Sequence, residues 1–326
     1  MASVIAALRR VKDDLPSILE AQNIERLCAE LGYSWRAGPL NPVNTVALFV
    51  QQVIAGNIAC TAVRHQAEQT FTGSAYCQAR QRLPLELLHR LLTQVGLQAA
   101  RRLAVDPQSR WKDHRLWAAD GSSFSMPDTP ELQAHFGQAQ GLRAGCGFPV
   151  AHLLALLDLH TGMLAEPVAG PLYTSDLHDV AALHAQMAEG DLLLGDDFFS
   201  NYGHVALLQQ QKQHFLGPNH HRRIVSFKTR RRHVQPKGGR IGPRAKGQPR
   251  SRWLRRLGWR DQLVEWFKPP RCPDWMSPQV WASLPQSIVV REICRTVRRK
   301  GLASFRLTIL TTLPFITDCP ALKAPA

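Results

Sequence analysis

The sequence predicts an α/β protein in which an all-helical domain (residues 1–105) precedes a core of strands and helices (residues 106–326). Before residue 105, apolar residues recur at helical spacing. After Arg110, short apolar runs end at Gly, Ser or Asp, as strands do. With 326 residues and 44% hydrophobic residues, the chain can build a substantial core. Two of the apolar runs lead directly to acidic residues, which indicates a sheet with carboxylates at one edge.

The amino-terminal part carries repeated start and stop signals for helices. Asp14-Leu15-Pro16 places an acidic cap and a first-turn proline before apolar residues that continue to Gly32. Asn41-Pro42 opens a second helix, which should stop at Gly56-Asn57. Further helices are expected at 58–70, 74–82 and 84–103. The basic and polar residues of this part either contact DNA phosphates or form its solvated face: Arg64, His65, Arg80, Gln81 and Arg82.

Two acidic strand ends follow in the second part. The apolar run 116–119 leads to Asp120 in a Gly-Ser-Ser turn, and the run 192–194 leads to Asp196 and Asp197. A strand at 148–159 and a helix at 176–188 lie between them, so both acids should leave the same edge of one mixed sheet. This arrangement predicts a divalent-metal site.

The later elements predict a β-rich insertion at about 220–303. A helix at 202–211 and a strand at 214–217 precede Gly-, Pro- and Arg-rich sequence that runs to about residue 252. Strands are then expected within 253–267, at 288–297 and at 305–313. His184 and the His220-His221 pair are interpreted as solvated, because no spacing completes a set of metal ligands.

The positive charge is concentrated in one segment. The chain has 40 Lys and Arg against 25 Asp and Glu, a formal net charge of +15. Fifteen of the basic residues lie between Arg222 and Arg260, where there is no acid. Such a segment either binds an anionic partner, most commonly a phosphate backbone, or is a solvated loop. The predicted DNA contacts are Arg222, Arg223, Lys228, Arg230, Arg231, Arg232, Lys237, Arg240, Arg244, Lys246, Arg250, Arg252, Arg255 and Arg256.

Cysteine usage and hydropathy indicate a cytoplasmic protein with no membrane partner. The seven cysteines are scattered and include no Cys-x-x-Cys pair, so they are expected to be reduced thiols. The apolar runs are too short to span a bilayer, and no secretory leader is expected from residues 1–8.

Several motifs in order resemble the DDE transposases of bacterial insertion sequences, in the "insertion sequence four" family. The resemblance covers residues 20–313. In the helical part it is carried by Gly56-Asn and by Ser-Ala-Tyr-Cys-Gln-Ala-Arg-Gln-Arg-Leu-Pro at 74–84. In the core it is carried by Asp120-Gly-Ser, Ser-Met-Pro-Asp-Thr-Pro-Glu at 125–131, Gly-Asp-Leu-Leu-Leu-Gly-Asp at 190–196, Asp-Gln-Leu-Val-Glu-Trp at 261–266, Trp275-Met-Ser-Pro, Leu284-Pro and Val290-Arg-Glu.

The resemblance implies a ribonuclease-H-like core behind a helical DNA-binding domain. It makes Asp120 and Asp196 the first two catalytic carboxylates and ligands of Mg²⁺ (or Mn²⁺), which would support phosphodiester cleavage and strand transfer. Asp197 stands where the family usually has arginine, and this leaves it as the alternative second acid. Double-stranded DNA is the implied partner, both as terminal repeats and as target. A homodimer is one candidate assembly, and the bacterial nucleoid is the expected place of action.

The third carboxylate of the family is absent from this sequence. It belongs to a Tyr-x2-Arg-x3-Glu-x6-Lys signature on a helix after the strand that matches 305–313, and no tyrosine follows Tyr202. The tail after Leu313 is interpreted as truncated or out-of-frame sequence, so the chain alone is expected to be weakly active or inactive. Two alternatives stay open: a non-catalytic DNA-binding remnant or inhibitor, and a nuclease that recruits Glu265 or Glu292 as its third ligand.

Overall fold

The computed structural model describes most of the chain. The described residues are 19–67, 70–103, 110–138, 143, 147–165, 167–173, 177–178, 180–234, 247–299 and 302–313. The chain divides into two compact units, one of Met1–Ser109 with Leu159–Glu166 and one of Arg110–Asp158 with Pro167–Ala326. The predicted cap at residues 14–16 and the tail at 314–326 lie outside the described residues. None of the described helices is long and apolar enough to cross a bilayer.

The described part of 19–103 is helical. Its elements are α2 (Ala21–Glu30), α3 (Pro42–Ile54), α4 (Cys60–Val63), the 3₁₀ turn η1 (Arg64–Gln66), α5 (Gly73–Arg82) and α6 (Leu85–Leu103). The predicted stop signals are confirmed. Gly32 and Gly56 have φ values of 65° and 84°. The residues after them donate to carbonyls five residues back, Tyr33 to Cys28 and Asn57 to Gln52, which terminates α2 and α3.

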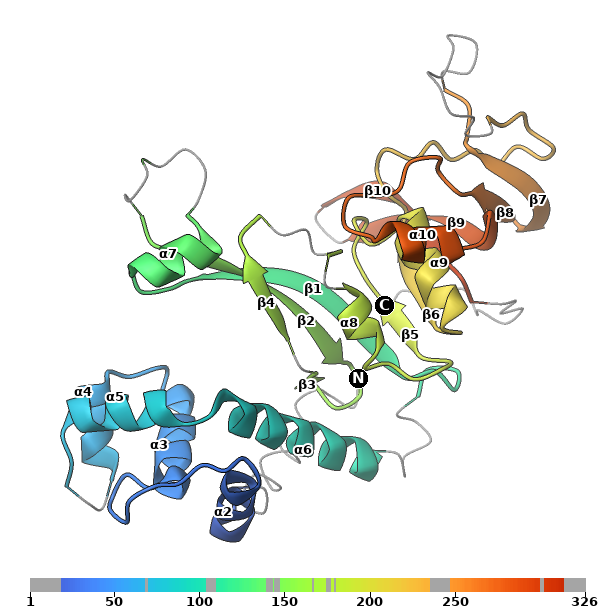
Figure 1. The fold of residues 1–326 in the computed structure, drawn as a ribbon. Helices are drawn as coiled ribbons and strands as arrows, with labels where there is room; N and C mark the ends of the chain where they lie inside the picture. The colour runs from blue at the N-terminus through green and yellow to red at the C-terminus, as the bar shows by residue number, and fades with distance from the viewer. Residues whose placement is uncertain are drawn as a thin grey trace. The chain divides into compact units, whose positions relative to one another are not determined.

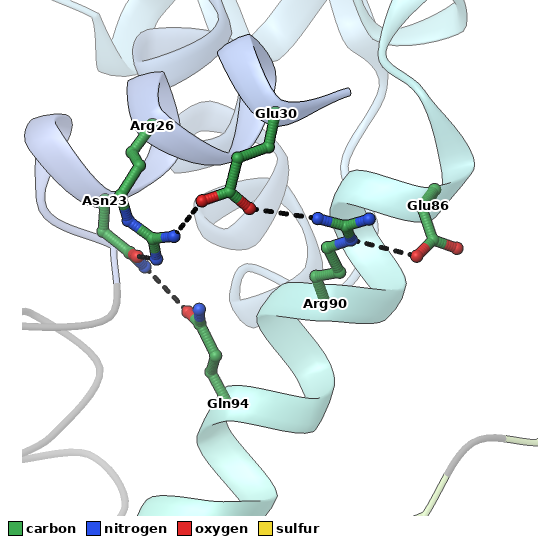
Figure 2. A network of polar contacts seen from close by, with 6 residues as sticks. All are labelled: Asn23, Arg26, Glu30, Glu86, Arg90 and Gln94. Carbon is green, nitrogen blue, oxygen red and sulfur yellow. Dashed lines mark hydrogen bonds and ion pairs between the residues drawn. The ribbon is translucent and has the colours of Figure 1, made fainter. Parts of the chain in front are cut away.

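Helices α2 and α6 are joined by apolar packing and by polar contacts. Ile24, Leu27 and Cys28 of α2 pack with Leu87 and Leu91 of α6. Figure 2 shows the polar network beside them: Glu30 pairs with Arg26 and Arg90, Arg90 with Glu86, and Asn23 with Gln94. Because these ion pairs are exposed, the apolar cluster contributes most of the stability here.

The second unit is built on a mixed sheet (Figure 1). Neighbouring strands follow the order β2-β1-β5-β6-β10-β9-β8-β7, and β4 pairs with β2. The strands are β1 (Leu116–Ser125), β2 (Val150–Asp158), β4 (Val168–Pro171), β5 (Leu192–Leu194), β6 (His214–Pro218), β7 (Ser251–Gly258), β8 (Asp261–Phe267), β9 (Ser287–Arg299) and β10 (Leu302–Thr311). The short strand β3 (Met163–Leu164) clusters with the first unit. This confirms the α/β class, with β5 parallel to both β1 and β6.

Four short helices accompany the sheet: α7 (Pro130–Phe136), α8 (Val180–His184), α9 (Tyr202–Gln210) and α10 (Pro278–Ser283). Helix α9 begins at Asn201, whose side chain accepts from the His204 amide at 3.0 Å, and most of its residues are buried. The predicted helix at 176–188 is shorter than expected, and α10 was not predicted. Its start is explained by Ser277, which accepts from the Val280 amide, and by Pro278.

One sequence prediction about a strand is wrong in detail. Asp120 does not enter a turn, because 121–125 continue β1 and pair with β2 from Gly121↔Leu154 to Ser125↔Val150. The strands after residue 250, expected as a β-rich insertion, belong to the same sheet. They extend outward from β10, which pairs with β6.

Candidate metal site and nucleic-acid interface

Asp120 and Asp196 both follow the paired stretch of two neighbouring parallel strands. Strands β1 and β5 pair in parallel register, and the last pair is Ala118↔Leu194. Each acid lies two residues beyond that pair, Asp120 within β1 and Asp196 in the turn that follows β5. Adjacent strands are about 4.8 Å apart. Both acids are exposed. The two acids that the sequence predicted therefore follow the paired part of two neighbouring strands, one within β1 and one just after β5.

The two acids are held in different ways. Asp120 is part of β1, where it is paired with Ala155 of β2, and its Oδ1 accepts from the Gly121 amide at 2.9 Å. Asp196 begins a turn beyond β5, and its Oδ1 accepts from the amides of Phe198 and Phe199 at 2.9 and 3.4 Å. These bonds to Asp196 all use Oδ1, so they leave Oδ2 available for another ligand.

Close packing fixes the Asp196 turn against the sheet. The Gly195 amide donates to the Leu216 carbonyl of β6 at 3.3 Å. A Cβ at Gly195 would lie 3.0 Å from the Phe199 ring, and one at Gly217 would lie 2.6 Å from the Gly195 carbonyl oxygen. Glycine is therefore needed at both positions, at Gly195 directly after β5 and at Gly217 in β6.

A buried pair of histidines, His184 and His204, is hydrogen-bonded to the Asp196 turn through His204. His204 Nδ1 lies 2.8 Å from the Phe199 carbonyl oxygen, and because that oxygen can only accept, Nδ1 carries the proton. His204 Nε2 then accepts from His184 Nε2 at 2.9 Å. Burial lowers the pKa of His204 to about 4 and the pKa of His184 well below its usual value. His184, expected to be solvated, is in fact 1% exposed.

Asp197 turns toward the segment that follows β6. Its Oδ2 accepts from both the amide and Nδ1 of His221, at 3.2 and 2.7 Å. The hydrogen bond from the His221 side chain is the main cause that lowers the pKa of Asp197. His221 stacks on His220, with ring centroids 4.4 Å apart. Asp197 is therefore a partner of His221, whereas Asp196 makes its bonds within its own turn. The sequence carried no signal for this contact.

Glu265 and Glu292 are placed away from the two acids. Glu292 pairs with Leu310, which is opposite Gly217 of β6, and its side chain is fully buried. Its strand is three strands from β5, roughly 14 Å. Glu265 accepts from Ser287 Oγ at 2.7 Å and pairs with Arg252. These contacts disfavour the nuclease with either glutamate as third ligand. Across the described residues, no three His, Cys, Asp or Glu side chains cluster closely enough to hold a metal ion.

The predicted DNA-contacting residues fall into three groups. Lys237, Arg240, Arg244 and Lys246 lie outside the described residues. Two others contact the protein: Arg223 lies over the Trp266 ring, and Arg231 donates to Ser226 and Ser251. The remainder are exposed, and of these Arg252, Arg255 and Arg256 lie on the edge strand β7: Arg222, Lys228, Arg230, Arg232, Arg250, Arg252, Arg255 and Arg256.

The basic residues of the helical unit are only partly on its surface. Arg80 donates to the Gln52 side chain at 2.9 Å and lies 5.5 Å from the centre of the Phe49 ring. The buried Tyr76 hydroxyl donates to the same Gln52 oxygen at 2.8 Å. Arg80 is thus part of the packing of the unit, while Arg64, His65, Gln81 and Arg82 are exposed.

Comparison with known proteins confirms the resemblance to insertion-sequence transposases. The chain is 31% identical over 151 residues to the putative transposase InsZ of Escherichia coli, a match that covers 44% of this chain and 49% of that protein. It is 26% identical over 238 residues to the Escherichia coli transposase InsG of insertion sequence element IS4, covering 73% of this chain and 46% of that protein. The chain thus spans about half the length of the curated relatives it matches.

The remaining two comparisons do not identify the fold. No protein-family model matches the sequence. The solved structure of endonuclease V from Bacillus subtilis aligns with 50% of this chain and 70% of that chain at 15% identity, but the TM-score is only 0.20.

Proposed function

We propose that this chain is the DNA-cleaving core of an insertion-sequence transposase, with a ribonuclease-H-like sheet and a helical DNA-binding unit at residues 1–105. The proposal rests on one observation above all: Asp120 and Asp196 each lie two residues beyond the last pair of the neighbouring parallel strands β1 and β5. The similarity to InsZ and to the IS4 transposase supports it. Double-stranded DNA, as element ends and as target, is the proposed substrate.

The residues fit a hard divalent cation. Carboxylate oxygens are the preferred ligands of Mg²⁺ and Mn²⁺, and both acids are exposed at one sheet edge. Asp120 and Asp196 would hold such an ion, which when bound would supply charge stabilisation for attack on a phosphodiester. Asp197 is proposed to position the turn through His221.

We infer that cleavage by this chain alone is weak, because no third carboxylate joins the two acids within the part of the chain that the structure describes. The second candidate, a non-catalytic DNA-binding remnant or inhibitor, is favoured by the same observation together with the basic segment. Either protein would act at the nucleoid in the bacterial cytoplasm, and a homodimer is the proposed assembly.

A labelled-DNA nicking assay with and without Mg²⁺ tests the proposal. Asp120→Asn and Asp196→Asn should each reduce Mg²⁺-dependent nicking to background while retaining DNA binding. Asp128→Asn is the matched control, because Asp128 is exposed and its Oδ1 accepts from the Gln133 side chain at 2.8 Å. Salt-sensitive binding without any nicking by the wild type would favour the remnant instead.

A further inference from the structure

Residues 219–234, which follow β6, form no helix or strand, yet three contacts fix them to the protein. The first contact is made by His221, which donates twice to Asp197 beside the Asp196 turn. Two residues later the Arg223 guanidinium lies 3.4 Å from the centre of the Trp266 ring. Further on, Arg231 Nη2 donates to Ser251 Oγ at 2.8 Å, and Nη1 donates to the Ser251 carbonyl. A segment that composition suggested to be a solvated loop is therefore anchored at both ends.

The same contacts close residues 226–231 into a compact loop. The Ser226 carbonyl accepts from Arg231 Nε at 2.9 Å, and it also accepts from Gln262 Nε2 of β8 at 3.0 Å. The Lys228 amide lies 3.5 Å from Ser226 Oγ. Arg230 has a φ of 49°, in the left-handed region that costs a residue with a Cβ about 1 kcal/mol. Such a conformation persists only where its surroundings hold it.

A buried carboxyl group explains why two arginines face inward. Glu292 is fully buried and accepts from Gln262 Nε2 at 2.8 Å. Burial raises its pKa, whereas the charges of Arg223 and Arg231 act in the opposite direction. Burial also lowers the pKa of Arg223 to about 10, which still leaves it charged at neutral pH. Both arginines therefore compensate Glu292 from inside the protein.

We propose that residues 226–232 form a preorganised phosphate-binding loop, which Arg223 and Arg231 anchor to the protein and from which Lys228, Arg230 and Arg232 contact the backbone phosphates of double-stranded DNA. The three contacting residues are exposed, whereas the anchors face Trp266, Ser251 and Glu292. The inference rests on the proposed function. It separates the predicted DNA-contacting residues of this segment into anchors and phosphate contacts. Because anchoring removes most of the ordering cost, this short loop can bind phosphates without folding on contact.

The salt dependence of DNA binding tests the contacting residues. Binding of a fluorescent duplex is measured by anisotropy between roughly 50 and 200 mM salt. Lys228→Ala, Arg230→Ala and Arg232→Ala should each lower the slope of log K against log salt by about 0.9. The matched control is Arg271→Ala, which removes an exposed cation that pairs with Asp274 at 3.0 Å and should leave the slope unchanged.

Trypsin cleavage after Lys228 and Arg230 tests the anchors. Arg231→Met should weaken DNA binding and speed cleavage at these two sites, because the loop loses its closure on Ser226 and Ser251. If Arg231→Met instead lowered the salt slope by about 0.9 with unchanged cleavage, Arg231 would be a phosphate contact and the division would be wrong.

The outcomes of these experiments distinguish a failure of the loop proposal from a failure of the proposed function. Wild-type protein that shows no salt-dependent DNA binding would overturn the proposed function. Wild-type binding whose slope is the same in the Lys228, Arg230 and Arg232 variants as in the Arg271 control would overturn the loop alone.

Discussion

His204 and His184 must be neutral when they are buried beneath the Asp196 turn. In the unfolded chain both have ordinary pKa values, whereas burial lowers the pKa of His204 from 6.5 to about 4 and lowers that of His184 as well. Below pH 6.5 the unfolded state therefore binds protons that the folded state does not bind. The stability from this pair is complete above that pH and is lost as the pH falls toward 4.

The resulting prediction concerns His204→Gln, which keeps a polar side chain but cannot titrate. The His204 pKa shift alone should cost the wild type about 2 kcal/mol of unfolding free energy between pH 7 and pH 5. The variant should lose correspondingly less over this interval, as measured by urea denaturation at both pH values. Parallel losses in the two proteins would show that His204 is not buried in its neutral form.

At the residue scale, the sequence indicated Asp120 and Asp196 as candidate acids, but it did not indicate the contacts that their neighbouring residues make. Asp120 and Asp196 could be found because apolar runs deliver them. Nothing in the sequence distinguishes Asp197 as the partner of His221, since 24 residues separate them and the contact depends on where β6 ends. His184 was misinterpreted for the same reason: its burial is created by α9, which is distant in sequence.

At the scale of elements, the junction of β5 and β6 is the most tightly packed part of the site. Gly217 of β6 leaves no room for a side chain, because a Cβ would lie 2.6 Å from the Gly195 carbonyl oxygen and 2.7 Å from the Phe215 ring. A methyl group there must push the Asp196 turn away from the sheet.

Gly217→Ala should therefore destabilise the protein by about 1–3 kcal/mol, the usual cost of overpacking. Gly258→Ala is the control, because its Cβ would meet nothing closer than 3.6 Å. Thermal and urea unfolding of both variants measure the difference. Equal stabilities would mean that the junction has more space than the structure shows.

Element types were predicted more accurately than element lengths. The glycine stops of α2 and α3 were located correctly because the stop depends on local backbone conformation. The sequence Gly-Ser-Ser after Asp120 is typical of a turn, yet β2 runs alongside it and recruits it into β1. Strand propensity is context-dependent, and here the pairing with a long apolar neighbour determines the structure.

At the scale of the whole molecule, the sheet relates the acids to the basic segment. Strand β6 lies next to β5 and leads into the anchored loop, while β7 and β8 carry the residues that hold it. The sequence predicted the α/β class and the helical first part. It could not predict that the strands after residue 250 join the same sheet, because β6 pairs with β10 across more than ninety intervening residues.

The central claim is that Asp120 and Asp196 form one divalent-metal site. Mn²⁺ binding, followed by the electron paramagnetic resonance signal of the free ion, tests it without requiring activity. We predict that wild type and Asp197→Asn bind Mn²⁺, and that Asp120→Asn and Asp196→Asn each lose that binding while keeping wild-type thermal stability. Undiminished binding by both of the latter variants would contradict the claim.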